Sequence, residues 1–151
     1  MVAAVAGSAA ARLVHDLLDD VWNRGLLDRV PRYLHPEYRQ IDERAEVSVR
    51  GHDEFVRSVQ GMRQLLDVVD MSLTHVVASG PDVAYRWRLL GRVRDAEVLS
   101  PAMRLMARHV PEVGLITVTG VNFAVVRDGL LVEEISELDP QAVAQQMGWW
   151  G

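Results

Sequence analysis

Cysteine and lysine are both missing from this sequence of 151 residues. Without cysteine, the chain forms no disulfides, thiolate zinc sites, iron–sulfur clusters or cysteine nucleophiles. Without lysine, it forms no Schiff base and has no P-loop lysine for phosphate. All 16 basic residues are therefore arginines. Any catalysis is expected to depend on a shaped cavity and on carboxylate or amide groups.

Long apolar runs are missing as well. No stretch reaches the roughly 18 apolar residues of a membrane helix, so we expect no membrane span. Residues 1–11 are small and apolar, but they lack the basic start of a signal peptide and continue into an amphipathic helix, so a cytoplasmic protein is expected. A basic balance is also missing, because the net charge is −5. This charge argues against nucleic acid and favours a neutral small molecule as the partner.

The chain does contain enough apolar material for one hydrophobic core. Hydrophobic residues make up 49% and charged residues 25% of the sequence, which is typical of a soluble globular protein. The length suits a single domain over residues 1–151, with residues 1–11 as a flexible end.

Apolar residues repeat at helical spacing in the first part of the chain. Residues 13–22 place them on one helical face, and Gly25 follows as a stop signal. A short helical turn is predicted over residues 28–33 and a strand over residues 38–42. Residues 51–66 then form a second long helix with a buried stripe.

From Asp70 onward the apolar period changes to 2, which predicts strands. Turn signals at residues 79–82 and 127–129 separate them into hairpins. Four strands are expected, over residues 71–77, 83–89, 115–127 and 130–137. A last helix begins after Asp139, which caps it, and runs to Met147.

Helices followed by long strands indicate an α+β domain, in which a curved antiparallel sheet wraps over the N-terminal helices and encloses a pocket. Residues 94–113 interrupt the strands and contain two prolines, which predicts a separate short helix or loop. In one interpretation this segment is a mobile lid, and Met103 and Met106 offer a ligand adaptable apolar surface. A dimer contact or disorder are the alternatives.

Several short strings, in their order and spacing, carry a resemblance to a known family. They are Trp22–Gly25, Leu34–Tyr38, Arg50–Phe55, Gly80–Trp87, Val126–Glu133 and Gln145–Gly148. Together they resemble the SnoaL-like polyketide cyclases of the nuclear-transport-factor-2-like superfamily. The resemblance covers about residues 12–150 and leaves residues 94–113 unmatched.

The resemblance implies a cone-shaped α+β fold with an internal apolar pocket and a homodimer. It also implies a cofactor-independent cyclase of isomerase or lyase type in antibiotic and other natural-product biosynthesis, which closes a carbon–carbon ring in a linear polyketide-type substrate. Two alternatives share this fold. One is a small-molecule-binding domain without turnover, and the other is an epoxide hydrolase or a cyclase that forms cyclic ethers.

The family's last strand reads Glu-His-Trp-Asp in the aldol-type cyclases, and this string falls on residues 133–136. The acid/base aspartate of the family corresponds to Ser136, and the inward histidine corresponds to Glu134. A second inward histidine of the family corresponds to Asn122. We therefore expect chemistry in which positioning dominates, such as a cycloaddition or conjugate addition. Glu134 or Asp42 is expected to assist a proton shift, and Asn122 or Tyr85 to bind a substrate carbonyl.

Two carboxylates are candidates for catalysis. Glu134 and Ser136 share a strand face by the period of two, and an inward Glu134 would have a raised pKa. The alternative is a shifted strand with Glu133 inward. Asp42 shares a face with Tyr38 and Gln40 and is a candidate second carboxylate at the mouth of the cone, or else a solvated turn residue.

The remaining candidates are expected to bind substrate. These residues are Tyr38, Gln40, His75, Tyr85, Trp87, Ser136, Met103 and Met106. Tyr85 and Trp87 are also typical core residues, and His75 is alternatively a buried structural histidine. No metal site is expected, because the five histidines show no i, i+4 pairing.

Overall fold

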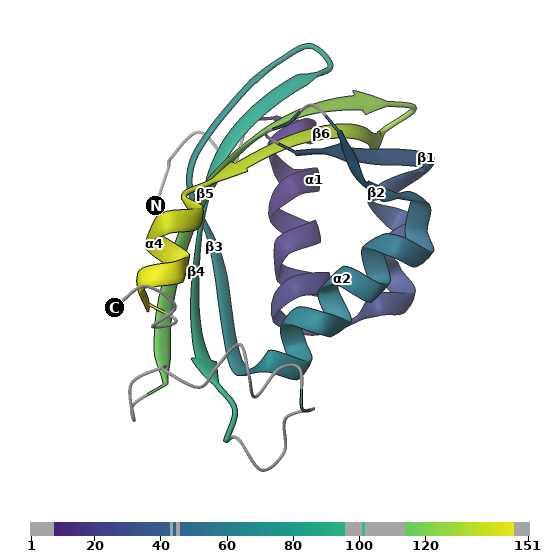
Figure 1. The fold of residues 1–151 in the computed structure, drawn as a ribbon. Helices are drawn as coiled ribbons and strands as arrows, with labels where there is room; N and C mark the ends of the chain where they lie inside the picture. Colours follow the sequence, from purple (N-terminus) through teal and green to yellow (C-terminus); the bar gives the residue numbers. More distant parts are fainter. Residues whose placement is uncertain (1–7, 43, 45, 96–100, 102–113, 147–151) are drawn as a thin grey trace.

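A curved six-stranded sheet wraps around helices on its concave side (Figure 1). The computed structural model describes residues 8–42, 44, 46–95, 101 and 114–146. Its helical segments are α1 (Ala9–Leu17), η2 (Leu18–Asn23), η3 (Leu27–Arg32), α2 (Gly51–Leu65) and α4 (Pro140–Gln146). Its strands are β1 (Leu34–Ile41), β2 (Val47–Arg50), β3 (Leu66–Ser79), β4 (Asp82–Val93), β5 (Leu115–Arg127) and β6 (Leu130–Leu138).

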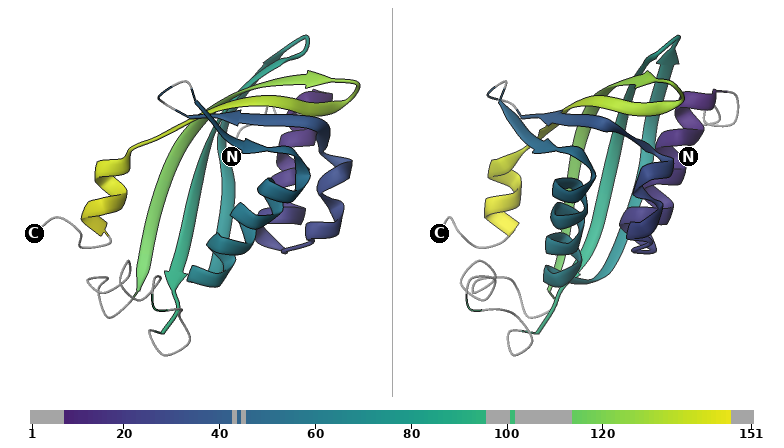
Figure 2. Two further views of the ribbon diagram at one scale, coloured as in Figure 1. Left: turned by 45° about the vertical axis from the view of Figure 1, so that its right-hand side comes forward. Right: turned by 90° about the vertical axis from the view of Figure 1, so that its right-hand side faces the viewer.

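The strands are ordered β2-β1-β6-β5-β4-β3. Every neighbouring pair is antiparallel except β1 and β6, which are parallel. The expectation of an α+β fold with a curved sheet over N-terminal helices is confirmed, although the sheet is mixed at this one pair. The additional views show α1 and α2 on the same side of the sheet, with α4 beyond β5 (Figure 2).

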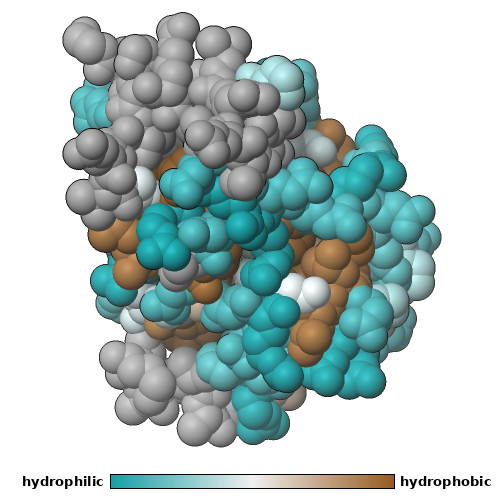
Figure 3. Space-filling model, turned by 90° about the horizontal axis from the view of Figure 1, so that it is seen from below, coloured by the Kyte–Doolittle hydropathy of each residue, from teal (hydrophilic) through white to brown (hydrophobic). Residues whose placement is uncertain are grey.

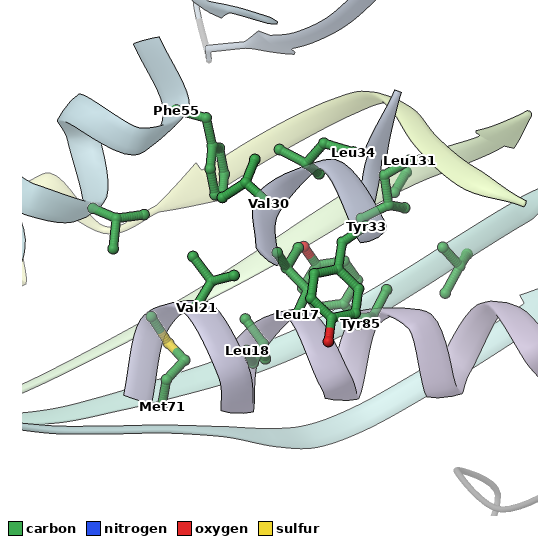
Figure 4. Packing of buried hydrophobic residues seen from close by; sticks show 14 of the residues in the cluster. Leu17, Leu18, Val21, Val30, Tyr33, Leu34, Phe55, Met71, Tyr85 and Leu131 are labelled. Carbon is green, nitrogen blue, oxygen red and sulfur yellow. The ribbon is translucent and has the colours of Figure 1, made fainter. Parts of the chain in front are cut away.

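The first predicted helix divides into two kinds of turn. Ser8 caps α1, and its hydroxyl accepts a hydrogen bond from the backbone N–H of Ala11 at 3.4 Å. From Leu18 the helix continues as η2, a π-helix, and the positive φ of Gly25 ends the segment. Leu17 and Leu18 are both buried and belong to the same hydrophobic cluster as Tyr85 of the sheet (Figure 4).

The predicted hairpin of β3 and β4 is present, but its first strand is irregular. A bulge between Leu73 and His75 adds one residue to β3 relative to β4. The apolar alternation therefore changes face, so that Val76 is buried while Val77 is exposed. His75 is exposed too, which corrects the alternative expectation of a buried structural histidine.

The other elements follow the sequence pattern closely. The turn at Asp128 and Gly129 has positive φ angles at both residues, as a tight Asp-Gly hairpin requires. Asp139 caps α4, because its carboxylate accepts backbone N–H bonds from Gln141 and Ala142 at 3.0 and 3.1 Å. The short strand β2 was not predicted.

Most of residues 94–113, including the predicted lid, lie outside the described residues, as do residues 1–7 and Met147. No helix in the described ranges has the length and apolar character needed to cross a membrane.

The buried carboxylate of Asp20 connects η2 to the segment around η3. Asp20 accepts hydrogen bonds from Arg24 at 3.0 Å, from Arg29 at 2.9 Å and from the Tyr33 hydroxyl. The hydrogen bond from Tyr33 and then that from Arg29 lower the pKa of Asp20 below its usual 3.8. The carboxylate therefore stabilises the fold in its ionised form.

We expect Asp20→Asn to lower the free energy of unfolding by about 2 kcal/mol at pH 7, because charge-assisted hydrogen bonds to buried groups are lost. Since the folded-state pKa is lowered, this stabilisation is fully present above pH 3.8 and declines as the pH falls further. Urea denaturation at several pH values measures it, and Asp19→Asn on the exposed side is the control. An equal loss in both variants would contradict the assignment.

Candidate functional site

A cavity of about 400 Å³ lies between the concave face of the sheet and the helices. Its helix wall is almost entirely apolar and is made by Leu17, Leu18, Trp22, Phe55, Met62 and Leu65. Its sheet wall combines apolar side chains with a group of polar ones, namely Tyr38, Gln40, Tyr85, Trp87, Asn122, Glu134 and Ser136. Seen from below, the molecule shows hydrophobic surface framed by hydrophilic residues (Figure 3). The sheet side of the cavity is its polar wall, and the helix side is its apolar wall.

The Glu134 carboxyl group is the centre of the polar wall. It is 2% exposed and points inward from β6. The Tyr38 hydroxyl donates a hydrogen bond to its Oε1 at 3.1 Å. Its Oε2 accepts one hydrogen bond from Asn122 Nδ2 at 2.9 Å and another from the Tyr85 hydroxyl. Three neighbouring side chains therefore hold this carboxyl group in one orientation.

Counting the acceptor positions of the carboxylate identifies its reactive oxygen. A carboxylate offers about two positions on each oxygen. Both positions on Oε2 are occupied by Asn122 and Tyr85, whereas among the described residues Oε1 accepts only the Tyr38 hydroxyl. The remaining position on Oε1 is where this group can gain or lose a proton without breaking a hydrogen bond.

Asn122 connects the strands on the other side of the carboxyl group. Its Nδ2 donates to Tyr85 at 3.0 Å as well as to Glu134, and its Oδ1 accepts from Trp87 Nε1 at 2.8 Å and Ser136 Oγ at 3.0 Å. Both lone pairs of Oδ1 are thus used within the protein, whereas the Tyr85 hydroxyl and Glu134 Oε2, which are hydrogen-bonded to each other, lie in nearly the same direction from Nδ2 and share one of its hydrogens. Asn122 positions the other groups, and its oxygen has no remaining hydrogen-bonding capacity for a ligand.

The strand register explains why these side chains meet. Asn122 on β5 is the register partner of both Tyr85 on β4 and Ser136 on β6. Trp87, two residues along β4, is the partner of Gly120. A Cβ atom at Gly120 would overlap the Trp87 ring, so the missing side chain lets the indole lie across β5. Glycine at this position therefore makes the hydrogen bond from Trp87 to Asn122 possible.

Burial controls the charge of the site. Desolvation raises the pKa of Glu134 above its ordinary 4.5, although the hydrogen bonds from Asn122, Tyr85 and Tyr38 act in the opposite direction. Desolvation, followed by the nearby charge of Glu134, raises the pKa of Tyr38 and of Tyr85 well above 10.0. Among the described residues that line the cavity, none is an arginine or a histidine. The carboxyl group therefore has no cationic partner there.

Most of the sequence-predicted site residues come together in this cavity. Glu134, Asn122, Tyr38, Gln40, Tyr85, Trp87 and Ser136 all line it. The alternative with Glu133 inward is wrong, because Glu133 faces the other way and accepts a hydrogen bond from Arg39 at 2.7 Å. The period of two along β6 predicted that Glu134 and Ser136 share a face, and the structure shows that this face is the inward one.

Asp42 and His75 are placed elsewhere. Asp42 accepts backbone N–H bonds from Arg44 and Glu46 at 2.9 and 3.1 Å, and its side chain also binds the Arg44 guanidinium. It is therefore a turn residue at the end of β1, as the alternative interpretation had it, and it does not line the cavity. His75 lies on the exposed face of β3 and does not line the cavity. Met103 and Met106 lie outside the described residues.

The sequence analysis missed the helix wall of the cavity. Phe55 packs edge-on against Trp22 and Tyr38, with ring centroids 5.9 and 5.6 Å apart. Helical periodicity indicated that these side chains are buried, but it did not distinguish a packed core from a cavity lining. The only available signal was the group of aromatic residues on both predicted helices and the first strand.

Within the described ranges, no group of three or more histidine, aspartate and glutamate side chains is arranged to hold a metal ion.

Solved structures with the same fold are similar to this chain over nearly its whole length. TsrD from Streptomyces laurentii shares 20% identity, with 94% of this chain and 96% of that chain covered and a TM-score of 0.73. A candidate polyketide cyclase from Acidithiobacillus ferrooxidans shares 17% identity, with 97% and 99% covered and a TM-score of 0.76. IdmH, a candidate polyketide cyclase from Streptomyces antibioticus, shares 18% identity, with 92% and 98% covered and a TM-score of 0.71.

Identities of this size establish the fold alone. No curated protein matches the sequence. The family model of the SnoaL-like domain matches residues 14–134, which include β1 to β5 and the first part of β6 up to Glu134. The chain therefore belongs to the SnoaL-like domain family.

Proposed function

We propose that this protein is a cofactor-independent cyclase that closes a carbon–carbon ring within a linear polyketide-type intermediate of natural-product biosynthesis. The observation that carries the proposal is the Glu134 carboxyl group, which is buried without a cationic partner in the polar wall of an otherwise apolar cavity. Buried charges of this kind are costly and cluster at functional sites. Structural neighbours that carry the name of candidate polyketide cyclases support the same class of reaction.

The apolar wall supplies the positioning. A flexible chain that folds against Leu17, Trp22, Phe55 and Met62 buries its apolar part, and its reacting carbons are held together. Such positioning alone contributes up to roughly 7–11 kcal/mol in ideal cases. A cycloaddition needs little more than such positioning of the reacting carbons.

A conjugate addition also needs a proton shift, for which Glu134 is suited. Its Oε1 takes a proton from the carbon beside a substrate carbonyl, and that carbon then bonds to the far carbon of an enone. The proton returns to the carbon chain, so the product is an isomer of the substrate. The raised pKa of Glu134 makes the carboxylate a stronger base than an exposed glutamate.

The epoxide-opening alternative has less support. It needs two carboxylates close together, and among the described residues that line the cavity Glu134 is the only carboxylate. A binding domain without turnover would use the same cavity, and the gene-deletion experiment below separates it from a cyclase.

We propose in addition that the protein is a homodimer that pairs through the outer face of its sheet. One cross-strand row on this face is apolar, with Val77, Phe123 and Ile135 exposed by 71%, 53% and 38%. Register joins Val77 to Ala84, Ala84 to Phe123, and Phe123 to Ile135, so the row crosses four strands. A contiguous apolar surface of this kind is typical of a protein interface.

Deletion of the gene is expected to leave an open-chain isomer of the natural product in the producing strain. The purified protein converts this compound to the cyclic product, and Glu134→Gln does so about 100-fold or more slowly, because the proton-shifting group is lost. Chromatography with mass spectrometry measures both. Glu133→Gln, which changes the outward neighbour, keeps the wild-type rate. An unchanged metabolite profile in the deletion strain would rule out the cyclase.

The titration of Glu134 is expected at a pH above the ordinary 4.5, and Tyr38→Phe raises its pKa further. The reason is that the hydrogen bond from Tyr38 favours the ionised carboxylate. Infrared spectroscopy of the carboxyl stretch, with Glu134→Gln to assign the band, measures the pKa without a substrate. Tyr33→Phe, whose hydroxyl binds Asp20, leaves it unchanged. A lower pKa in Tyr38→Phe would contradict this arrangement.

Phe123→Asp is expected to convert the dimer into a monomer, because it places a charge in the middle of the apolar row. Sedimentation velocity measures the molecular mass in solution. Gln60→Asp adds the same charge to the exposed side of α2 and leaves the dimer intact. If Phe123→Asp sediments like the wild type, the outer face of the sheet is not the interface.

A further inference from the structure

One polar side chain in the cavity has hydrogen-bonding groups that the protein does not use. Five polar side chains of the sheet wall form hydrogen bonds with Glu134 or with one another, namely Tyr38, Tyr85, Trp87, Asn122 and Ser136. The Ser58 hydroxyl donates to the Phe55 carbonyl. Among the described cavity-lining residues, the amide of Gln40 is the polar side-chain group with no hydrogen bond inside the protein. It is half-buried and lines the cavity.

The strand register places Gln40 beside the reactive carboxyl oxygen. Gln40 is the register partner of Glu134 across the parallel pair of β1 and β6. Tyr38, two residues earlier on the same face of β1, holds Oε1 of Glu134. Oε1 is therefore the oxygen on the β1 side, which is the side that Gln40 occupies.

The amide of Gln40 supplies hydrogen-bond donors that are not used within the described part of the protein. The hydroxyl hydrogens of Tyr38 and Tyr85 are directed at the carboxylate, and the amide of Asn122 already binds four side chains. The amide group of Gln40 has two N–H donors free. A ligand carbonyl that accepts one of them lies next to Oε1, where a proton on the neighbouring carbon can be removed.

We infer that Gln40 is the substrate-anchoring residue of the cavity and that it binds an uncharged carbonyl oxygen of the ligand beside Glu134. The role of this carbonyl in catalysis rests on the proposed function. Its binding by Gln40 does not require that the protein catalyses a reaction. Gln40 replaces Asn122 as the carbonyl-binding amide, because the Asn122 amide already binds four side chains, whereas the Gln40 amide binds none among the described residues.

The same geometry defines the ligand class. No arginine or histidine among the described lining residues can neutralise a ligand carboxylate, and Glu134 would repel it. The part of the substrate that enters the cavity is therefore apolar with a ketone, ester or thioester carbonyl. A free carboxylate stays outside the cavity.

Three probes of nearly equal shape test this assignment. They are methyl naphthyl ketone, the isosteric isopropenylnaphthalene, in which a methylene group replaces the carbonyl oxygen, and naphthoate. Equilibrium dialysis with the wild-type protein is expected to show the ketone binding about fivefold or more tightly than the alkene, because one hydrogen bond separates them. Naphthoate is expected to bind at least about tenfold more weakly than the ketone.

Gln40→Leu is expected to reduce the ratio of ketone to alkene affinity to about one while the protein stays folded, since its side chain forms no hydrogen bond in the protein. Ser58→Ala, the matched change of another polar lining residue, keeps the wild-type ratio.

A ratio that persists in Gln40→Leu, or a wild-type protein that binds neither neutral probe, would overturn the assignment of Gln40. Naphthoate binding as tightly as the ketone would overturn the neutral ligand class. If the affinity ratios hold while gene deletion leaves the metabolites unchanged, the anchor stands and the cyclase does not.

Discussion

The side-chain amide of Asn122 is the interaction on which the rest of the site depends. Its four hydrogen bonds connect β4, β5 and β6 and hold Tyr85, Trp87, Glu134 and Ser136 in one arrangement. An amide is suited to this role because it donates twice and accepts twice. A fully satisfied buried network of this kind is rigid, whereas one missing partner would leave several groups without hydrogen bonds. The orientation of the carboxyl group is thus decided by a residue that does not itself react.

The second constraint is the balance between burial and hydrogen bonding at Glu134. Burial favours the neutral acid, and three donors favour the anion. Desolvation is the larger effect, so the pKa of the carboxyl group is raised while the hydrogen bonds hold its position. The helix wall contributes no charged group to the cavity among the described residues.

Sequence periodicity was sufficient for most of the fold. The period of two along β6 placed Glu134 and Ser136 on one face but left open whether this face or that of Glu133 is inward, and turn chemistry at Asp128 and Gly129 located the hairpin. Periodicity failed at His75, because a bulge changes the face of a strand without a clear mark in the sequence. It also did not reveal that Asn122 binds four neighbouring side chains, since the number of hydrogen bonds depends on register between strands. The short strand β2 contains too few residues for a periodic signal.

The parallel pairing of β1 with β6 has a consequence for the order of folding. The hydrogen bond between Tyr38 and Glu134 joins residues that are 96 positions apart, whereas the hairpins of β3 with β4 and β5 with β6 form from local contacts. Contacts of such long range form late, because a large loop must close before they stabilise the chain. The hairpins carry Tyr85, Asn122 and Glu134, so that part of the network can form early. Tyr38 and Gln40 complete the polar wall only when β1 docks, which couples ligand recognition to completion of the fold.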